Sequence, residues 1–90
     1  MTPALEVAIK ANSEKNPAKK NLAKVREGCL NMLDEVDIHL NEGSIDPSEN
    51  LLCKVGDVLN SIEIYFSSVG MDISDLDAYR LKQIQKYLQI

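Results

Sequence analysis

The chain has 90 residues, of which 44% are hydrophobic and 27% charged, with a formal net charge of −4. These proportions are typical of an ordered globular protein, so we expect residues 1–90 to form one domain. The longest uncharged run, residues 64–71, is far shorter than the about 20 apolar residues of a membrane span, and no signal-peptide pattern opens the chain. We therefore expect a cytoplasmic protein without membrane contact.

Helix starts are predicted where a short polar residue precedes proline, because the polar side chain caps free N–H groups and proline tolerates the first helical position. Three dipeptides have this pattern: Thr2-Pro3, Asn16-Pro17 and Asp46-Pro47. A fourth start is expected near Ser74, and Gly43 and Gly70 are placed where helices commonly end in a left-handed residue. The sequence thus predicts helices over residues 3–12, 17–41, 47–69 and 75–89.

The two central predicted helices carry apolar rows with helical spacing. The row expected to face the core from the second helix is Leu22, Val25, Cys29, Met32, Val36 and Leu40. The corresponding row of the third helix is Leu51, Val55, Val58, Ile62, Tyr65 and Val69. No window has the two-residue alternation of a strand, and short loops favour antiparallel neighbours. The predicted fold class is all-α, a compact up-down helical bundle of three main helices plus a short N-terminal helix.

Further leucines and one phenylalanine lie beside these rows and widen the apolar surface beyond a single helix–helix contact. We expect a homodimer that forms through the second and third helices. The residues assigned to this self-association are Leu30, Leu33, Leu52, Leu59 and Phe66.

Charge is distributed unevenly along the chain: residues 1–27 sum to +3, residues 28–78 to −10, and residues 79–90 to +3. One interpretation is pairing within the bundle, with the basic end of the last helix beside the acidic end of the second. The other is an acidic face that binds a basic protein, since charge complementarity raises association rates and selectivity. The residues assigned to that partner-binding face are Asp34, Glu35, Asp37, Glu42, Glu49, Asp57 and Glu63.

Candidate chemical groups are few. His39 is the only histidine, and it is interpreted as a residue at the rim of the loop. Cys29 and Cys53 lie in apolar surroundings that do not favour a reactive thiolate, and both are expected to be reduced. The segment around Gly43 lacks the first oxygen ligands of a calcium-binding loop. We expect no catalytic, cofactor-binding or metal-binding residues, and hence no enzyme.

The leading hypothesis is a non-catalytic protein-binding module that acts by stoichiometric contact: an inhibitor, an immunity or anti-defence protein, or a small adaptor. The second hypothesis is a DNA-binding regulator that reads DNA with four residues of the last helix: Arg80, Lys82, Gln83 and Lys86. The aspartates at the start of that helix and the negative net charge disfavour it. A third hypothesis is an oligomer that sequesters a small ligand near three tyrosines: Tyr65, Tyr79 and Tyr87.

Overall fold

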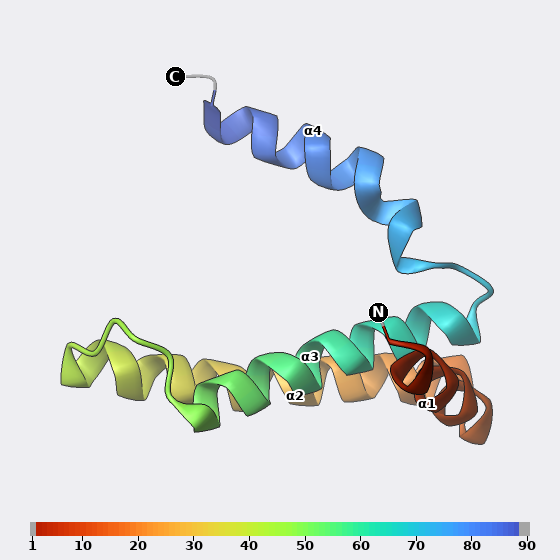
Figure 1. Cartoon of the computed structure of the whole chain (residues 1–90), viewed down its shortest axis with the longest axis horizontal. Helices are drawn as coiled ribbons and strands as arrows, with labels where there is room; N and C mark the ends of the chain where they lie inside the picture. The colour runs from red at the N-terminus through yellow and green to blue at the C-terminus, as the bar shows by residue number, and fades with distance from the viewer. Residues whose placement is uncertain (1, 89–90) are drawn as a thin grey trace.

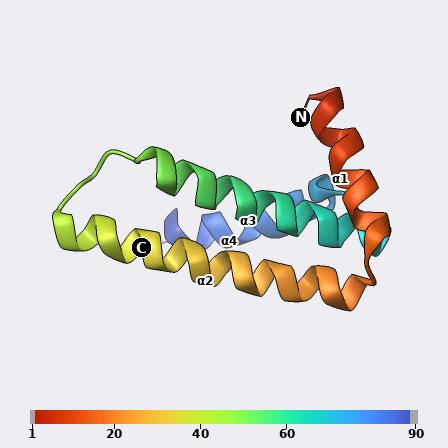
Figure 2. The same ribbon diagram turned by 90° about the horizontal axis from the view of Figure 1, so that it is seen from below.

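The computed structural model describes residues 2–88, which form five helical elements and no strand. In chain order these are α1 (Pro3–Lys15), α2 (Ala18–Glu42), α3 (Glu49–Ser68), the 3₁₀ turn η1 (Ile73–Leu76) and α4 (Asp77–Leu88). Helices α2 and α3 run side by side in opposite directions, and α1 packs across α3 (Figures 1 and 2). The predicted all-α helical bundle is confirmed. No helix among these residues combines the length and apolar content required to cross a membrane.

The interface between the two helices of the α2–α3 hairpin, which we call the seam, contains small, polar and apolar residues. Val58 of α3 is buried and faces Gly28 of α2, where a Cβ atom would lie 3.5 Å from Val58 Cγ2. The two helices approach closely at this point because Gly28 has no side chain. The other buried or half-buried seam residues include Asn21, Met32 and His39 on α2, and Leu51, Lys54 and Tyr65 on α3.

The apolar row predicted to face the core from the second helix is only partly correct. Half of its residues are exposed, and each directly follows a seam residue: Leu22 after Asn21, Cys29 after Gly28, and Leu40 after His39. Adjacent rows on a helix repeat with the same three- to four-residue spacing, so periodicity alone does not decide which row meets the neighbouring helix.

Polar side chains attach α1 to the hairpin. Ile9 is buried against α3, and the Ser67 hydroxyl donates to Ser13 Oγ at 3.1 Å. Asn21 is 1% exposed and donates from Nδ2 to the carbonyl oxygens of Ser13 at 3.3 Å and Asn16 at 3.4 Å. These bonds hold the bend between α1 and α2, and they dock a helix that is too short to be stable alone.

Three predicted helix signals are confirmed. Thr2 caps α1, because its Oγ1 accepts the Leu5 N–H at 3.2 Å. Gly43 follows α2 with φ of 69°, and Gly70 follows α3 with φ of 75°. These backbone angles favour glycine because a Cβ atom strains the left-handed region.

Three predicted caps are wrong. The start expected at Ser74 is capped by Asp72, whose carboxylate accepts the Ser74 N–H. Helix α2 begins after Pro17 without a side-chain cap, and Asn16 instead ends α1. The cap of α3 is Ser48 rather than Asp46, because Ser48 Oγ accepts the Leu51 N–H at 3.1 Å. In both places proline precedes the first helical residue instead of occupying it, which shifts the start by one or two positions. The predicted end of the last helix at residue 89 lies outside the described residues.

Helix α4 diverges from the hairpin (Figure 1). Within residues 2–88 its main contacts are with η1, the short turn directly before it. The expected pairing of its basic end with the acidic end of α2 is not formed in this part of the chain, where the one contact of a carboxylate with a basic side chain within 4.0 Å joins Glu35 and the neutral ring of His39. The charges of α4 and the hairpin therefore remain uncompensated by each other.

Candidate protein-binding surfaces

One side of the hairpin carries a row of uncovered apolar side chains on each helix. In both helices the row consists of residues that directly follow seam residues. We call these eight residues the apolar face: Leu22, Cys29, Leu33 and Leu40 on α2, and Leu52, Val55, Leu59 and Phe66 on α3. Seven of them are exposed, and only Phe66 is half-buried.

The two rows of the apolar face point to the same side of the hairpin. Two antiparallel neighbouring helices are related by a two-fold axis perpendicular to the plane that contains both. Rotation about this axis leaves a side chain above the plane above it, and one below the plane below it. Side chains at the same offset from the seam therefore share a side. The residues that precede the seam point to the opposite face and are mostly polar: Lys20, Glu27, Asn31 and Ile38 on α2, and Asn50, Cys53, Asp57 and Ile64 on α3.

An open groove of about 450 Å³ lies on the apolar side. Its lining residues are Leu5, Gly56, Leu59, Asn60, Glu63 and Ile73. Since Leu59 belongs to the apolar face and Ile73 to η1, η1 lies on this side of the hairpin. Figures 1 and 2 show α4 continuing over the same side while diverging from it. The apolar face and α4 thus lie on the same side of the hairpin.

The loop end of the hairpin collects carboxylates. Between Arg26 and Lys54 the chain has no lysine or arginine, whereas residues 34–49 include six acidic residues. Ile45, at the tip of the loop, is 95% exposed beside them. We call five exposed carboxylates the acidic end: Asp34, Asp37, Glu42, Asp46 and Glu49.

The seven acids predicted to bind a partner do not all lie together. Asp34, Asp37, Glu42 and Glu49 belong to the acidic end. Of the rest, Glu35 is half-buried at the seam, Asp57 points to the opposite face and Glu63 lines the groove beside η1. The sequence pattern correctly located the acidic segment. It did not show that these three residues lie apart from the other four.

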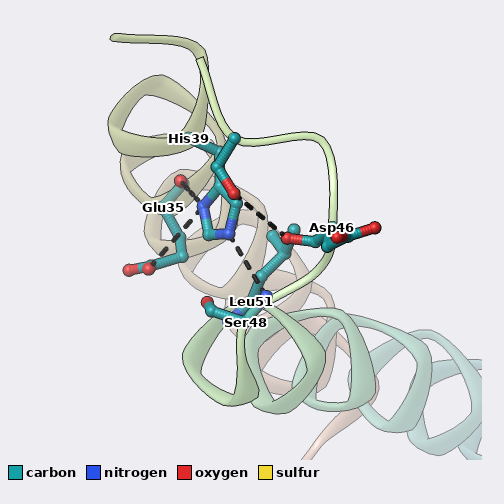
Figure 3. A network of polar contacts seen from close by, with 6 residues as sticks. Glu35, His39, Asp46, Ser48 and Leu51 are labelled. Atoms are coloured by element: carbon teal, nitrogen blue, oxygen red, sulfur yellow. Dashed lines mark hydrogen bonds and ion pairs between the residues drawn. The ribbon is translucent and has the colours of Figure 1, made fainter. Parts of the chain in front are cut away.

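His39 joins the two helices at the loop (Figure 3). Its Nε2 accepts the Ser48 backbone N–H at 3.2 Å, and its Nδ1 lies 3.0 Å from the Glu35 carbonyl oxygen. Because Nε2 accepts, the neutral ring carries its proton on Nδ1 and donates it to that carbonyl. The Glu35 carboxylate Oε1 is 4.0 Å from the same nitrogen. Both ring nitrogens are therefore engaged, Nδ1 within α2 and Nε2 across the loop to Ser48.

A reciprocal cap fixes η1. The Asp72 carboxylate accepts the Ser74 N–H at 3.2 Å and the Ser74 hydroxyl, while the Asp75 carboxylate accepts the Asp72 N–H at 2.9 Å. The Ser74 hydroxyl, followed by the Ser74 N–H, holds the pKa of Asp72 below its usual value of 3.8. Helix α4 follows η1 without an intervening residue, so the capped turn sets the direction in which α4 leaves the hairpin.

Four of the five residues predicted for self-association belong to the apolar face: Leu33, Leu52, Leu59 and Phe66. The fifth, Leu30, is exposed on the outer side of α2. Sequence reasoning assigned the other four members of the face to the bundle core. Each of these four residues directly follows a residue of the α2–α3 interface. That position could be recognised only after the structure had shown which residues form the interface.

The tyrosines proposed to hold a small ligand are not brought together. Tyr65 is half-buried on α3, where its ring centroid lies 5.8 Å from that of Phe66. Tyr79 and Tyr87 are exposed on α4, whose main contacts within residues 2–88 are with η1. The rings that were expected to enclose a ligand therefore belong to elements that are not packed together.

No group of three or more histidine, cysteine, aspartate or glutamate side chains in residues 2–88 is arranged to hold a metal ion. No protein-family model, curated protein or solved structure matches the chain. The apolar face and the acidic end are the two surfaces on which the described residues gather exposed groups of one kind.

Proposed function

We propose that this chain is a non-catalytic protein-binding module that acts by stoichiometric contact with a basic partner. Inhibitors, immunity or anti-defence proteins and small adaptors act in this way. The observation that supports the proposal is the acidic end, where five exposed carboxylates lie near one loop without a lysine or arginine in the same segment.

A basic partner surface would relieve the repulsion among these carboxylates. Complementary charges steer two proteins together and raise the association rate, an effect that weakens as salt screens it. Ile45, 95% exposed at the tip of the loop, supplies apolar area at the same end. Binding would therefore combine charge-assisted encounter with a small apolar contact.

The test is affinity capture from the native host with the full chain, followed by mass spectrometry and reconstitution with the purified partner. An acidic-end variant, Asp34→Asn with Asp37→Asn and Glu42→Gln, should lose the partner. A matched control removes three negative charges elsewhere through Glu6→Gln, Glu14→Gln and Asp77→Asn, and it should retain the partner.

Calorimetry of the reconstituted pair should give a fixed stoichiometry, and its association rate should fall with rising ionic strength. Equal capture by the acidic-end variant and the control would overturn the assignment of the binding surface. Failure of the full chain to retain any partner at physiological salt would overturn the proposed function.

DNA binding through α4 is the second candidate, because this helix is exposed along its described length and carries Arg80, Lys82 and Lys86. Asp77 in its first turn counts against it, since the start of a recognition helix commonly meets the bases. Gel-shift titration at low salt separates the candidates. A shift that disappears in the Arg80→Ala, Lys86→Ala double variant supports DNA binding, and no shift with the native chain rejects it.

A further inference from the structure

The single chain exposes more surface than a folded protein of its size. Its accessible area is 7121 Å² for a mass of 10.0 kDa, whereas a folded monomer of that mass exposes about 5,200 Å². The excess is about 1,900 Å² per chain. Two copies that buried this excess would remove about 3,800 Å² from water, which falls within the range of obligate homodimers, roughly 2,000–5,000 Å².

Two apolar surfaces contribute to this exposure. One is the apolar face of the hairpin. The other is a row on α4 with the spacing of a single helical stripe: Leu81, Ile84 and Leu88, all more than half exposed. A free helix of twelve residues is marginal in water, so α4 requires a surface to pack against.

The structure directs α4 away from its own hairpin. Ile73 of η1 lines the groove beside Leu59, and the Asp72–Asp75 reciprocal cap holds the turn. Because α4 begins at the residue after η1, closure onto its own hairpin requires a change in this turn or in the linking residues 69–72. A second copy can supply the missing helix while η1 keeps its position.

We propose that two copies of this chain exchange their C-terminal helices. The Leu81–Ile84–Leu88 stripe of each α4 packs onto the apolar face of the other copy's hairpin. The contact is two-fold symmetric, so it closes as a dimer and leaves no half unpaired. None of the eight residues of the apolar face is charged. An α4 stripe that packs onto this face therefore covers only uncharged side chains.

This inference does not depend on the proposed function, because it uses the apolar face and α4 instead of the acidic end. Failure of one proposal would leave the other intact. The charge variants that test partner binding leave every residue of the apolar face and of the α4 stripe unchanged.

Sedimentation velocity of the full chain over a range of concentrations is the first test. The native chain should sediment as a dimer, twice the chain mass of 10.0 kDa. Leu59→Glu on the apolar face and Ile84→Glu on α4 should each raise the dimer dissociation constant at least about 30-fold, as loss of a central interface residue does. Ile38→Glu, on the opposite face of the hairpin, is the matched control and should leave it unchanged.

Mixing the two variants tests the exchange itself. A heterodimer of the Leu59→Glu and Ile84→Glu chains keeps one undamaged α4–hairpin contact. The mixture should therefore sediment partly as a dimer at a concentration where each variant alone is monomeric. Far-ultraviolet circular dichroism of each variant checks that its helix content matches that of the native chain.

Three results would overturn the proposal. A native chain that stays monomeric at all concentrations would mean that α4 closes onto its own hairpin. An Ile84→Glu chain that dimerises normally would mean that the hairpins associate without α4. A mixture that stays monomeric, although both variants are folded, would mean that the two surfaces do not meet across the dimer.

Discussion

At the scale of single residues, His39 has the most defined surroundings of any ionisable group in the hairpin. Its ring accepts the Ser48 N–H and donates to the Glu35 carbonyl, so it links the last turn of α2 to the residue that caps α3. The only histidine of the chain thus has a structural role in the loop. The sequence predicted its location at the loop, but not its burial or its partner.

We expect His39→Phe to destabilise the chain by about 1–3 kcal/mol, because the Ser48 N–H loses its acceptor in a part-buried site. Urea unfolding followed by circular dichroism measures this change. Ser44→Ala, which alters an exposed loop hydroxyl nearby, should stay within about 0.5 kcal/mol of the native chain. Equal stabilities of His39→Phe and the native chain would show that the loop does not depend on the imidazole.

Asp72 should titrate below its usual pKa of 3.8, because the Ser74 hydroxyl and N–H donate to its charged form. The folded-state pKa is lowered, so the stability that this cap contributes is present above about 3.8 and declines as pH falls through the folded value. Ser74→Ala should move the Asp72 pKa back toward 3.8. Carboxyl carbon shifts in a nuclear magnetic resonance titration measure both values, and identical values in the two chains would contradict this account.

At the scale of the elements, two glycines should respond to alanine in opposite ways. Gly56 lies within α3, and a Cβ atom there would meet nothing within 4 Å. We expect Gly56→Ala to stabilise the chain by up to about 1 kcal/mol, since alanine restricts the unfolded chain and favours helix. Gly43 has φ of 69° at the end of α2, so Gly43→Ala should destabilise by about 1 kcal/mol. Thermal unfolding of both variants compares the two effects, and a destabilised Gly56→Ala chain would contradict the first.

At the scale of the whole molecule, the two cysteines report on the proposed dimer without any substitution. Both are free and exposed in the single chain, with Cys29 on the apolar face and Cys53 on the opposite face. When nine in ten chains are paired, alkylation of Cys29 should slow about tenfold, because only the unpaired tenth reacts. Iodoacetamide labelling at low and high protein concentration, read by mass spectrometry, measures both sites. Cys53 should react at the same rate throughout, and an equally constant rate at Cys29 would contradict the exchange.

The sequence by itself determined the helical fold class, the approximate helix spans and the segment that carries the acidic residues. It could do so because caps, left-handed glycines and helical spacing are local: Thr2, Gly43 and Gly70 act on backbone within one turn of themselves. Tertiary structure decided which of two adjacent rows on α2 became the seam, since Gly28 meets Val58 and His39 meets Ser48 while Cys29 and Leu40 beside them stay uncovered. It also decided the position of α4, because Ile73 of η1 shares a groove with Leu59 and Glu63 of α3, a placement that no local sequence signal specifies.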